Sequence, residues 1–250
     1  MREDRLFVPT PDGPMETAVV WPEGSGPFPA VVMYHHIGGL HEGLLALARR
    51  LASYGYCVFA PSLYWRVGTV EIDPDNTDPV SLAMRGVVVK TAETPFQVMN
   101  DTRYLLDYIK HMRQVDDGPR GAVGYCLGGL FAVRASCVFP DEIKASASLY
   151  GVGMLTEGEE SLEATLGRMT GSTYLAFAEH DKHVSAEDVE RVRELFAKHC
   201  EADWSVERLD GTRHGFAFPG RPMYDFEAAE HTWDKVLSVF DARLGTGAGS

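Results

Sequence analysis

Short apolar segments typical of β-strands alternate along this chain with segments that have the periodicity of α-helices. No other feature constrains the fold as strongly. Parallel strands need a long crossover connection, which is usually a helix, so this alternation is the pattern of parallel βαβ units. We predict an α/β protein with a mostly parallel central sheet and helices on both of its faces.

The expected elements can be placed from apolar runs, turn residues and helical spacing. The segments expected to form parallel strands are 30–36, 56–60, 122–125, 145–150, 173–178 and 204–209. The segments expected to form helices are 44–54, 95–112, 128–138, 185–199 and 226–243. Ahead of them, residues 6–8 and 17–21 flank Pro11-Asp12-Gly13-Pro14, which predicts an N-terminal β-hairpin.

Length and composition favour one globular domain over residues 1–250. The chain is 45% hydrophobic and 24% charged, close to the average of folded domains, and it contains no internal repeat or linker-like stretch. Residues 67–94 have weak periodicity and several Asp and Pro residues, which is typical of an irregular loop or a lid. We expect residues 245–250 to form a frayed tail.

Charge and cysteine usage exclude several classes of function. Lys and Arg total 23 against 36 Asp and Glu, a net charge of −13 that would repel nucleic acid and anionic membranes. No apolar run has the 18 or so residues of a membrane span, and the opening segment lacks the apolar region of a signal peptide. The four cysteines have no CxxC spacing, so we expect free thiols in a cytoplasmic protein rather than disulfides or a zinc site.

The most informative motif is Gly124-Tyr-Cys-Leu-Gly128, where a predicted strand ends and a helix begins. A sharp turn at this place presents its central residue to solvent, and the flanking glycines let the backbones approach each other. Cys126 would then lie at a helix N-terminus, where the partial positive charge favours a thiolate nucleophile. The simpler alternative is a small residue packed in a tight turn.

Two further residues fit a nucleophile of this kind. Asp181 follows the strand expected at 173–178, and His214 follows the strand expected at 204–209. Nucleophile, acid and histidine then occur in the chain order of α/β-hydrolases, all at the carboxyl edge of the sheet. Taken alone, Asp181 would be interpreted as the residue of a loop-stabilising Asx turn, and His214 as a solvated loop histidine. The placement of both residues at the same sheet edge favours a catalytic triad.

At this point the chain resembles the dienelactone hydrolase family of α/β-hydrolases, from about Leu6 to Leu244. Gly-Tyr-Cys-Leu-Gly-Gly at 124–129 is similar to the nucleophile motif of that family, Ala-Pro-Ser-Leu-Tyr at 60–64 to its turn after the preceding strand, and His-Gly-Phe at 214–216 to its histidine loop. The resemblance implies the α/β-hydrolase fold and a triad of Cys126, His214 and Asp181. It also implies an oxyanion hole made by the backbone N–H groups of Ile37 and Leu127.

These roles imply hydrolysis of a small ester or lactone through a thioester, with no metal or organic cofactor. The alternative is a binding or redox-sensing protein in which Cys126 is a reactive thiol without turnover. A small molecule would be the only partner, and both a monomer and a homodimer stay open.

Two positions depart from the family pattern. His36 stands where the family carries a glutamate that acts on the cysteine. If it lies near Cys126, a protonated His36 would favour the thiolate, whereas a neutral one would only accept a hydrogen bond from the thiol. Phe218 stands where the family carries an arginine that holds a substrate carboxylate. A neutral, more apolar substrate is therefore at least as likely as a dienelactone carboxylate.

Other residues are weaker candidates for the substrate pocket. Arg66, Arg85 or Arg221 could supply the missing charge from another direction. Aromatic residues near the strand ends could line an apolar pocket or simply belong to the core: Tyr34, Trp65, Phe216 and Phe218. His180 and His183 flank Asp181 at a spacing that metal ligands can have, but solvated loop histidines are the expected reading. Cys57, Cys137 and Cys200 are expected to be buried structural thiols.

Overall fold

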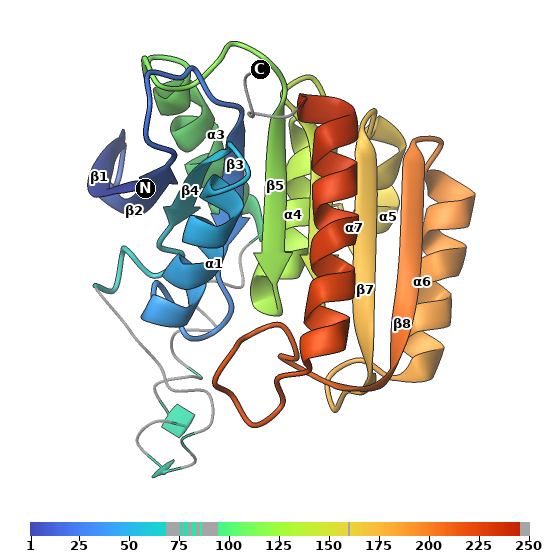
Figure 1. Cartoon of the computed structure of the whole chain (residues 1–250). Coiled ribbons are helices and arrows are strands. Elements are labelled where there is room, and N and C mark those ends of the chain that lie inside the picture. Colours follow the sequence, from blue (N-terminus) through green and yellow to red (C-terminus); the bar gives the residue numbers. More distant parts are fainter. Residues whose placement is uncertain are drawn as a thin grey trace.

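Eight strands form one sheet in the computed structural model, in the order β1-β2-β4-β3-β5-β6-β7-β8 (Figure 1). The structure describes residues 1–68, 76, 78–79, 82–83, 86, 95–159 and 161–245. Almost all of the expected loop at 67–94, with the candidate Arg85, lies outside these described residues, and so do residues 246–250 of the expected tail.

The sheet is parallel from β4 to β8 and antiparallel at its N-terminal edge. The strands are β1 Arg2–Thr10, β2 Gly13–Trp21, β3 Ala30–Tyr34, β4 Cys57–Pro61, β5 Arg120–Tyr125, β6 Ile143–Leu149, β7 Ser172–His180 and β8 Asp203–Arg213. The β1–β2 pair is the expected N-terminal hairpin. The mostly parallel sheet predicted from the alternation is confirmed, because a parallel ladder joins every neighbouring pair from β4 onward.

Helices cover both faces of the sheet, as expected (Figure 1). On one face lie α1 Glu42–Ala52 and α7 Phe226–Leu244, and on the other lie α3 Pro95–Ile109, α4 Leu127–Val138 and α6 Ala186–His199. The short helix α5 Leu162–Thr165 runs into a 3-10 turn at Leu166–Arg168. Helix α6 begins with a reciprocal capping box between Ser185 and Asp188.

The core lies in layers on either side of the sheet because side chains alternate along each strand. Val31 and Met33 of β3 pack with α1 and α7, whereas Val32 and Tyr34 of the same strand pack in the cluster that contains α3 and part of α4. A third cluster joins α4 and α6 over β7 and β8. The parallel strands are buried on both sides, so their carboxyl ends form the accessible edge for a site.

Three of the cysteines have the structural role expected of them. Cys57, Cys137 and Cys200 are buried free thiols, whereas Cys126 is partly exposed. Among the described residues, no helix is long and apolar enough to cross a membrane.

Candidate active site

Cys126 lies in the sharp turn between β5 and α4. Its φ of 54° and ψ of −118° are unfavourable for a residue with a side chain. Three backbone hydrogen bonds hold this conformation: the Cys126 N–H donates to the carbonyl of Leu149 at 3.0 Å, and the Cys126 carbonyl accepts from Gly129 at 3.0 Å and Val152 at 3.2 Å. The strain is therefore supported by β6 and by the first turn of α4.

The glycines around Cys126 are required by close backbone contact. A Cβ on Gly124 would collide with the carbonyl oxygen of Gly128, and a Cβ on Gly128 would collide with the carbonyl oxygens of Tyr34 and His35. The motif therefore has the structural reason that the sequence indicated. Strand β3, the turn at Cys126 and helix α4 meet too closely for any side chain at these two positions.

Asp181 and His214 meet at the ends of β7 and β8. Oδ2 of Asp181 lies 2.7 Å from Nδ1 of His214, and Oδ1 accepts a hydrogen bond from the His183 N–H at 2.8 Å. The Asp181 side chain is 0% exposed and that of His214 is 19% exposed. The Asx turn and the contact with histidine, weighed as alternatives from the sequence, are both present in the same carboxylate.

The protonation of His214 depends on its two neighbours. Burial lowers the pKa of His214, but the hydrogen bond to Asp181 and the interaction with Cys126 outweigh it and raise the pKa to about 9. Nε2 of His214 is buried and has no well-formed hydrogen bond to any described residue. The side-chain interaction with Cys126 that helps to raise this pKa thus lacks the geometry of a well-formed hydrogen bond, as is common in unliganded sites.

The loop after β3 positions the Ile37 N–H. Nε2 of His35 accepts a hydrogen bond from the Leu63 N–H at 2.9 Å, so Nδ1 carries the proton and donates to the carbonyl of His36 at 2.6 Å. The Tyr64 hydroxyl donates to the carbonyl of Ile37 at 3.2 Å. Among the described residues, neither the Ile37 N–H nor the Leu127 N–H has an acceptor, so both donors are available to a ligand.

His36 is 3% exposed and neutral. Burial, together with the neighbouring histidines and Arg221, lowers its pKa to about 2. Nδ1 accepts a hydrogen bond from the Gly38 N–H at 2.9 Å, and Nε2 lies 2.6 Å from Nε2 of His41. Both ring nitrogens therefore have partners other than Cys126. The charged form considered from the sequence is not supported, and the neutral ring is not free to accept from the thiol.

Two residues expected at a substrate pocket contact α3 instead. Tyr34 is 0% exposed on the α3 face, with its hydroxyl 2.7 Å from Oγ1 of Thr102. Trp65 packs beside the hairpin turn and donates to Asp101 at 3.0 Å. These contacts do not support a role for Tyr34 or Trp65 in binding substrate.

Phe216 and Phe218 lie near the site but under its surface. Phe216 is 0% exposed and meets the Tyr150 ring edge-on, with ring centres 5.1 Å apart. Phe218 is 1% exposed, and its ring centre lies 4.6 Å from the ring centre of His36. The expectation that Phe218 contacts substrate directly, as an arginine would, is therefore not supported, because its ring is packed away from solvent.

The two described candidate arginines differ in position. Arg66 is held by Asp12 and Asp101, so it does not supply a charge to the site. Arg221 is near the site, because its charge acts on both His36 and Tyr150. The described residues contain no group of three side chains suited to a metal ion. His183 instead lies edge-on to His214, with ring centres 4.9 Å apart.

Tyr150 was not identified from the sequence. It follows β6 at the same sheet edge, has a φ of 41°, and lies edge-on to His214 with ring centres 5.1 Å apart. Its hydroxyl is buried and has no partner among the described residues. Its place at the carboxyl end of a parallel strand was the available signal. Its backbone strain, like that of Cys126, is typical of functional sites.

The mostly parallel eight-stranded sheet with helices on both faces has the α/β-hydrolase fold. Residues 15–244 match the dienelactone hydrolase family, and the chain belongs to that family.

Two of its relatives illustrate the likeness. A protein of Escherichia coli (strain K12) named "Putative carboxymethylenebutenolidase" is 30% identical over 226 residues, covering 87% of this chain and 78% of that protein. The crystal structure of a dienelactone hydrolase-like promiscuous phosphotriesterase, P91 from metagenomic libraries, has a TM-score of 0.79 at 22% identity, covering 98% of this chain and 99% of that one. The family and these names indicate a hydrolase that acts on esters or lactones.

Proposed function

We propose that the protein hydrolyses a small ester or lactone with Cys126 as nucleophile, His214 as proton carrier and Asp181 as the group that orients His214. The observation that carries this proposal is the 2.7 Å contact between Asp181 and His214, beside a cysteine held at a φ of 54°. A side chain that merely packs would not require a strained turn, a buried carboxylate and an imidazole whose pKa is raised to about 9.

In the first step, the Cys126 sulfur attacks the carbonyl carbon and the carbonyl π electrons move to oxygen. The Ile37 and Leu127 N–H groups would stabilise this oxyanion, and one such donor typically contributes about 3 to 4 kcal/mol to the transition state. As the oxyanion collapses, the C–O bond to the leaving alcohol breaks. The imidazolium of His214 gives its proton to that oxygen, which leaves a thioester on Cys126.

In the second step, neutral His214 removes a proton from water as its oxygen attacks the thioester carbonyl. The second oxyanion collapses, the C–S bond breaks, and the carboxylic acid leaves with Cys126 as thiolate and His214 as imidazolium. Asp181 stabilises that cation in both steps through its hydrogen bond to Nδ1. Atoms and charge balance with water as the only co-reactant.

The substrate that best fits is a neutral or weakly polar ester or lactone. Arg66 is held in ion pairs and Phe218 replaces the arginine expected from the family, so the strong carboxylate anchor of that pattern is absent from position 218. Arg221, whose charge acts on His36, is the described cation to test. We expect a neutral lactone to have a higher kcat/KM than its carboxylate-bearing analogue. Arg221→Met should lower the kcat/KM for the carboxylate-bearing analogue further.

The direct experiment follows product release from short-chain activated esters by wild type and three variants. Cys126→Ala and His214→Ala should lose sustained release by at least about 10³-fold. Cys200→Ser is the matched control, because Cys200 is a buried free thiol at the C-terminal end of α6. Release that survives in Cys126→Ala would exclude that residue as the nucleophile.

The non-catalytic alternative makes a different prediction for the same experiment. A redox or ligand-capturing thiol would give one equivalent of labelled protein and no further product. The family to which the chain belongs does not favour this alternative. A single-turnover burst with no steady state, seen across the whole ester panel, would nevertheless establish it.

A further inference from the structure

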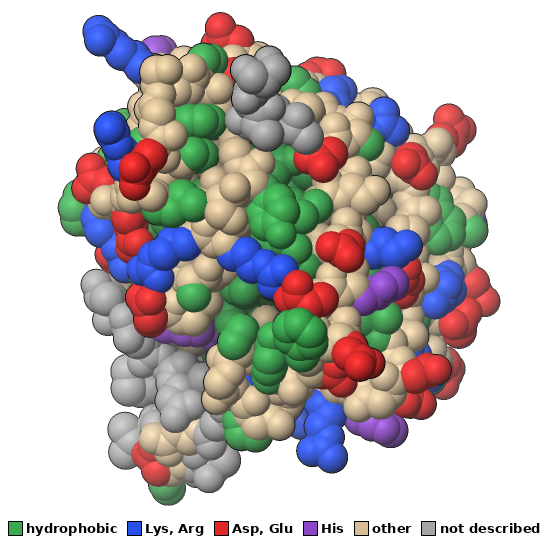
Figure 2. Space-filling model, viewed as in Figure 1, with side chains coloured by type: hydrophobic (Ala, Val, Ile, Leu, Met, Phe, Trp, Pro, Cys, Tyr) green, Lys and Arg blue, Asp and Glu red, His purple; other side chains and the backbone are tan. Residues whose placement is uncertain are grey.

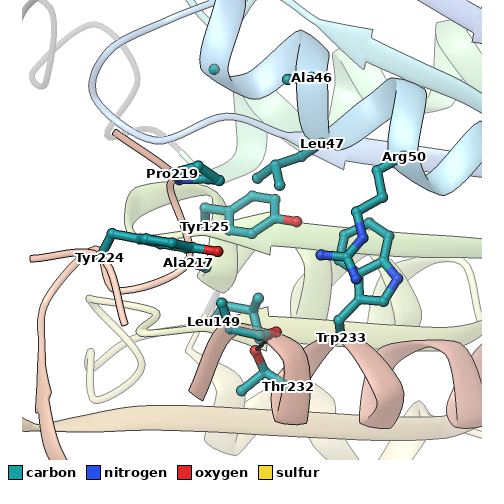
Figure 3. Close-up of a pocket in the computed structure, with 12 residues that line it drawn as sticks. Ala46, Leu47, Arg50, Tyr125, Leu149, Ala217, Pro219, Tyr224, Thr232 and Trp233 are labelled. Atoms are coloured by element: carbon teal, nitrogen blue, oxygen red, sulfur yellow. Dashed lines mark hydrogen bonds between the residues drawn. The ribbon is translucent and has the colours of Figure 1, made fainter. Parts of the chain in front are cut away.

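A cavity of about 160 Å³ lies between α1 and α7, on the sheet face that they cover (Figure 3). Its walls come from α1, from the ends of β5 and β6, from the loop after His214 and from α7. They are formed by Gly43, Ala46, Leu47, Arg50, Tyr125, Leu149, Ala217, Pro219, Tyr224, Ala229, Thr232 and Trp233. Neither Cys126 nor His214 is among these residues, so the cavity adjoins the candidate active site without including its nucleophile or histidine.

The Tyr125 hydroxyl is a hydrogen-bond donor in the wall of the cavity. Tyr125 is 1% exposed, and its ring crosses the cavity in Figure 3 with the hydroxyl directed toward Arg50. No hydrogen bond joins this hydroxyl to a described residue, and it is not one of the fully buried atoms that lack a partner, so it is accessible from the cavity. Burial raises the pKa of Tyr125, so it is a neutral phenol with a proton to donate. A ligand oxygen in the cavity can therefore accept a hydrogen bond from it.

The charge at the wall is already compensated. Both terminal nitrogens of Arg50 lie 2.6 Å from the carboxylate oxygens of Glu230, and the guanidinium stacks 4.2 Å from the Trp233 ring. An anionic ligand would therefore find no unpaired cation in Arg50, and it would also meet a protein of net charge −13. On the face of the molecule seen in Figure 2, apolar side chains are exposed between acidic and basic ones.

Size limits the occupant to about one ring. A cavity of roughly 150 Å³ lined by apolar side chains holds a benzene molecule. We propose that the cavity between α1 and α7 binds a small neutral ring compound bearing a ketone or phenol oxygen, which accepts a hydrogen bond from the Tyr125 hydroxyl. Leu47, Leu149 and Trp233 contact the apolar part of the ring.

Cyclohexanone tests this proposal without being a substrate for ester hydrolysis. We expect calorimetric titration to give saturable binding with a Kd around 1 mM. Tyr125→Phe keeps the ring but removes the donor, and it should weaken binding roughly fivefold. Ala46→Leu places a larger side chain in the cavity from an exposed position on α1, and it should abolish the saturable binding of cyclohexanone. Cyclohexanecarboxylate should bind more weakly than cyclohexanone.

Matched variants separate this site from the catalytic one. Tyr108→Phe on α3 and Ala197→Leu on α6 carry the same changes elsewhere and should bind as wild type does. Cys126→Ala should also bind normally, whatever becomes of the proposed hydrolysis. The proposal is overturned if cyclohexanone shows no saturable binding, if Tyr125→Phe and Ala46→Leu bind like wild type, or if Cys126→Ala abolishes binding.

Discussion

The two ring nitrogens of His35 hold the loop that carries the Ile37 N–H, one donor of the proposed oxyanion hole. The ring of His35 links the Leu63 N–H to the carbonyl of His36, and this fixes the peptide whose N–H belongs to Ile37. Burial lowers the pKa of His35 to about 4, so the ring keeps one proton and one lone pair at neutral pH. In the proposed mechanism, His35 is therefore a positioning residue rather than a group that touches the substrate.

Replacing His35 should affect turnover more than binding. His35→Phe removes both hydrogen bonds and should lower kcat by about 10²-fold with a smaller change in KM, because the affected donor acts on the oxyanion. His35→Gln can still donate and accept, so it should recover much of that loss. His111→Phe, on a histidine at the exposed end of α3, is the control. If kcat falls only as much as the amount of folded protein, and His35→Gln does not restore it, then His35 has a purely structural role.

The raised pKa of His214 predicts the alkaline side of the activity profile. In the proposed mechanism, acylation needs the imidazolium as proton donor, so its rate should fall as pH rises through about 9. Asp181→Asn removes the hydrogen bond that raises this pKa, and the alkaline limb should move to lower pH while kcat falls by roughly 10³- to 10⁴-fold. Single-turnover acylation measured across pH tests both effects. If the alkaline part of the pH–rate profile is unchanged in Asp181→Asn, then Asp181 does not raise the pKa of His214.

The same shift has a consequence for stability. The pKa of His214 is about 9 in the folded protein and 6.5 as an isolated group, so the folded state binds its proton more tightly. Its contribution is complete below about pH 6.5 and is lost as pH rises to about 9. Chemical unfolding of wild type and His214→Gln at several pH values measures this contribution. The difference in free energy of unfolding between the two proteins should become smaller as pH rises over that range.

At the scale of elements, the sequence predicted each parallel strand and its helix because both periodicities are strong in buried βαβ units. Strand β3 nevertheless ends at Tyr34 rather than at His36, since side-chain bonds from His35 replace the ladder there. Strand β8 continues to Arg213, beyond its apolar run, and so delivers His214 directly. The helix at 162–165 is too short for its periodicity to be recognised.

The turn between β5 and α4 should tolerate no side chain at Gly124. Gly124→Ala should lower the free energy of unfolding by about 3 kcal/mol, because the new Cβ would displace the Gly128 carbonyl. Gly167→Ala is the matched control, since its Cβ would lie 3.5 Å from the His199 carbonyl oxygen, an ordinary contact. Denaturant unfolding of both variants measures the difference. A Gly124→Ala protein as stable as the control would show that the turn can relax.

At the scale of the whole molecule, parallel topology explains why three distant residues could be predicted to meet. Strands β5, β7 and β8 run in the same direction, so residues that follow them share one edge. The pocket lining could not be predicted in this way. Whether Phe218 or Tyr34 faces solvent depends on how loops and helices pack, and apolar side chains at a strand end suit a pocket and a core equally.

Arg66 connects three segments that are far apart in the sequence. It pairs with Asp12 in the hairpin turn at 2.8 Å and with Asp101 of α3 at 2.7 Å, and it stacks 4.1 Å from the Trp65 ring. The Asp101 side chain is 12% exposed, whereas that of Asp12 is 57% exposed. Loss of the arginine would leave one carboxylate largely buried and without its cation, which is the costly case.

Arg66→Met should therefore destabilise the protein by about 2 kcal/mol, lowering Tm by roughly 4 to 8 °C. Double-mutant cycles should locate this loss. Coupling of Arg66 with Asp101 should exceed about 1 kcal/mol, and coupling with Asp12 should be smaller because solvent screens an exposed pair. Thermal unfolding at low and high salt provides the check, since only the Asp12 coupling should fade with salt. Equal couplings would mean that Arg66 joins the hairpin and α3 by stacking on Trp65 rather than by charge.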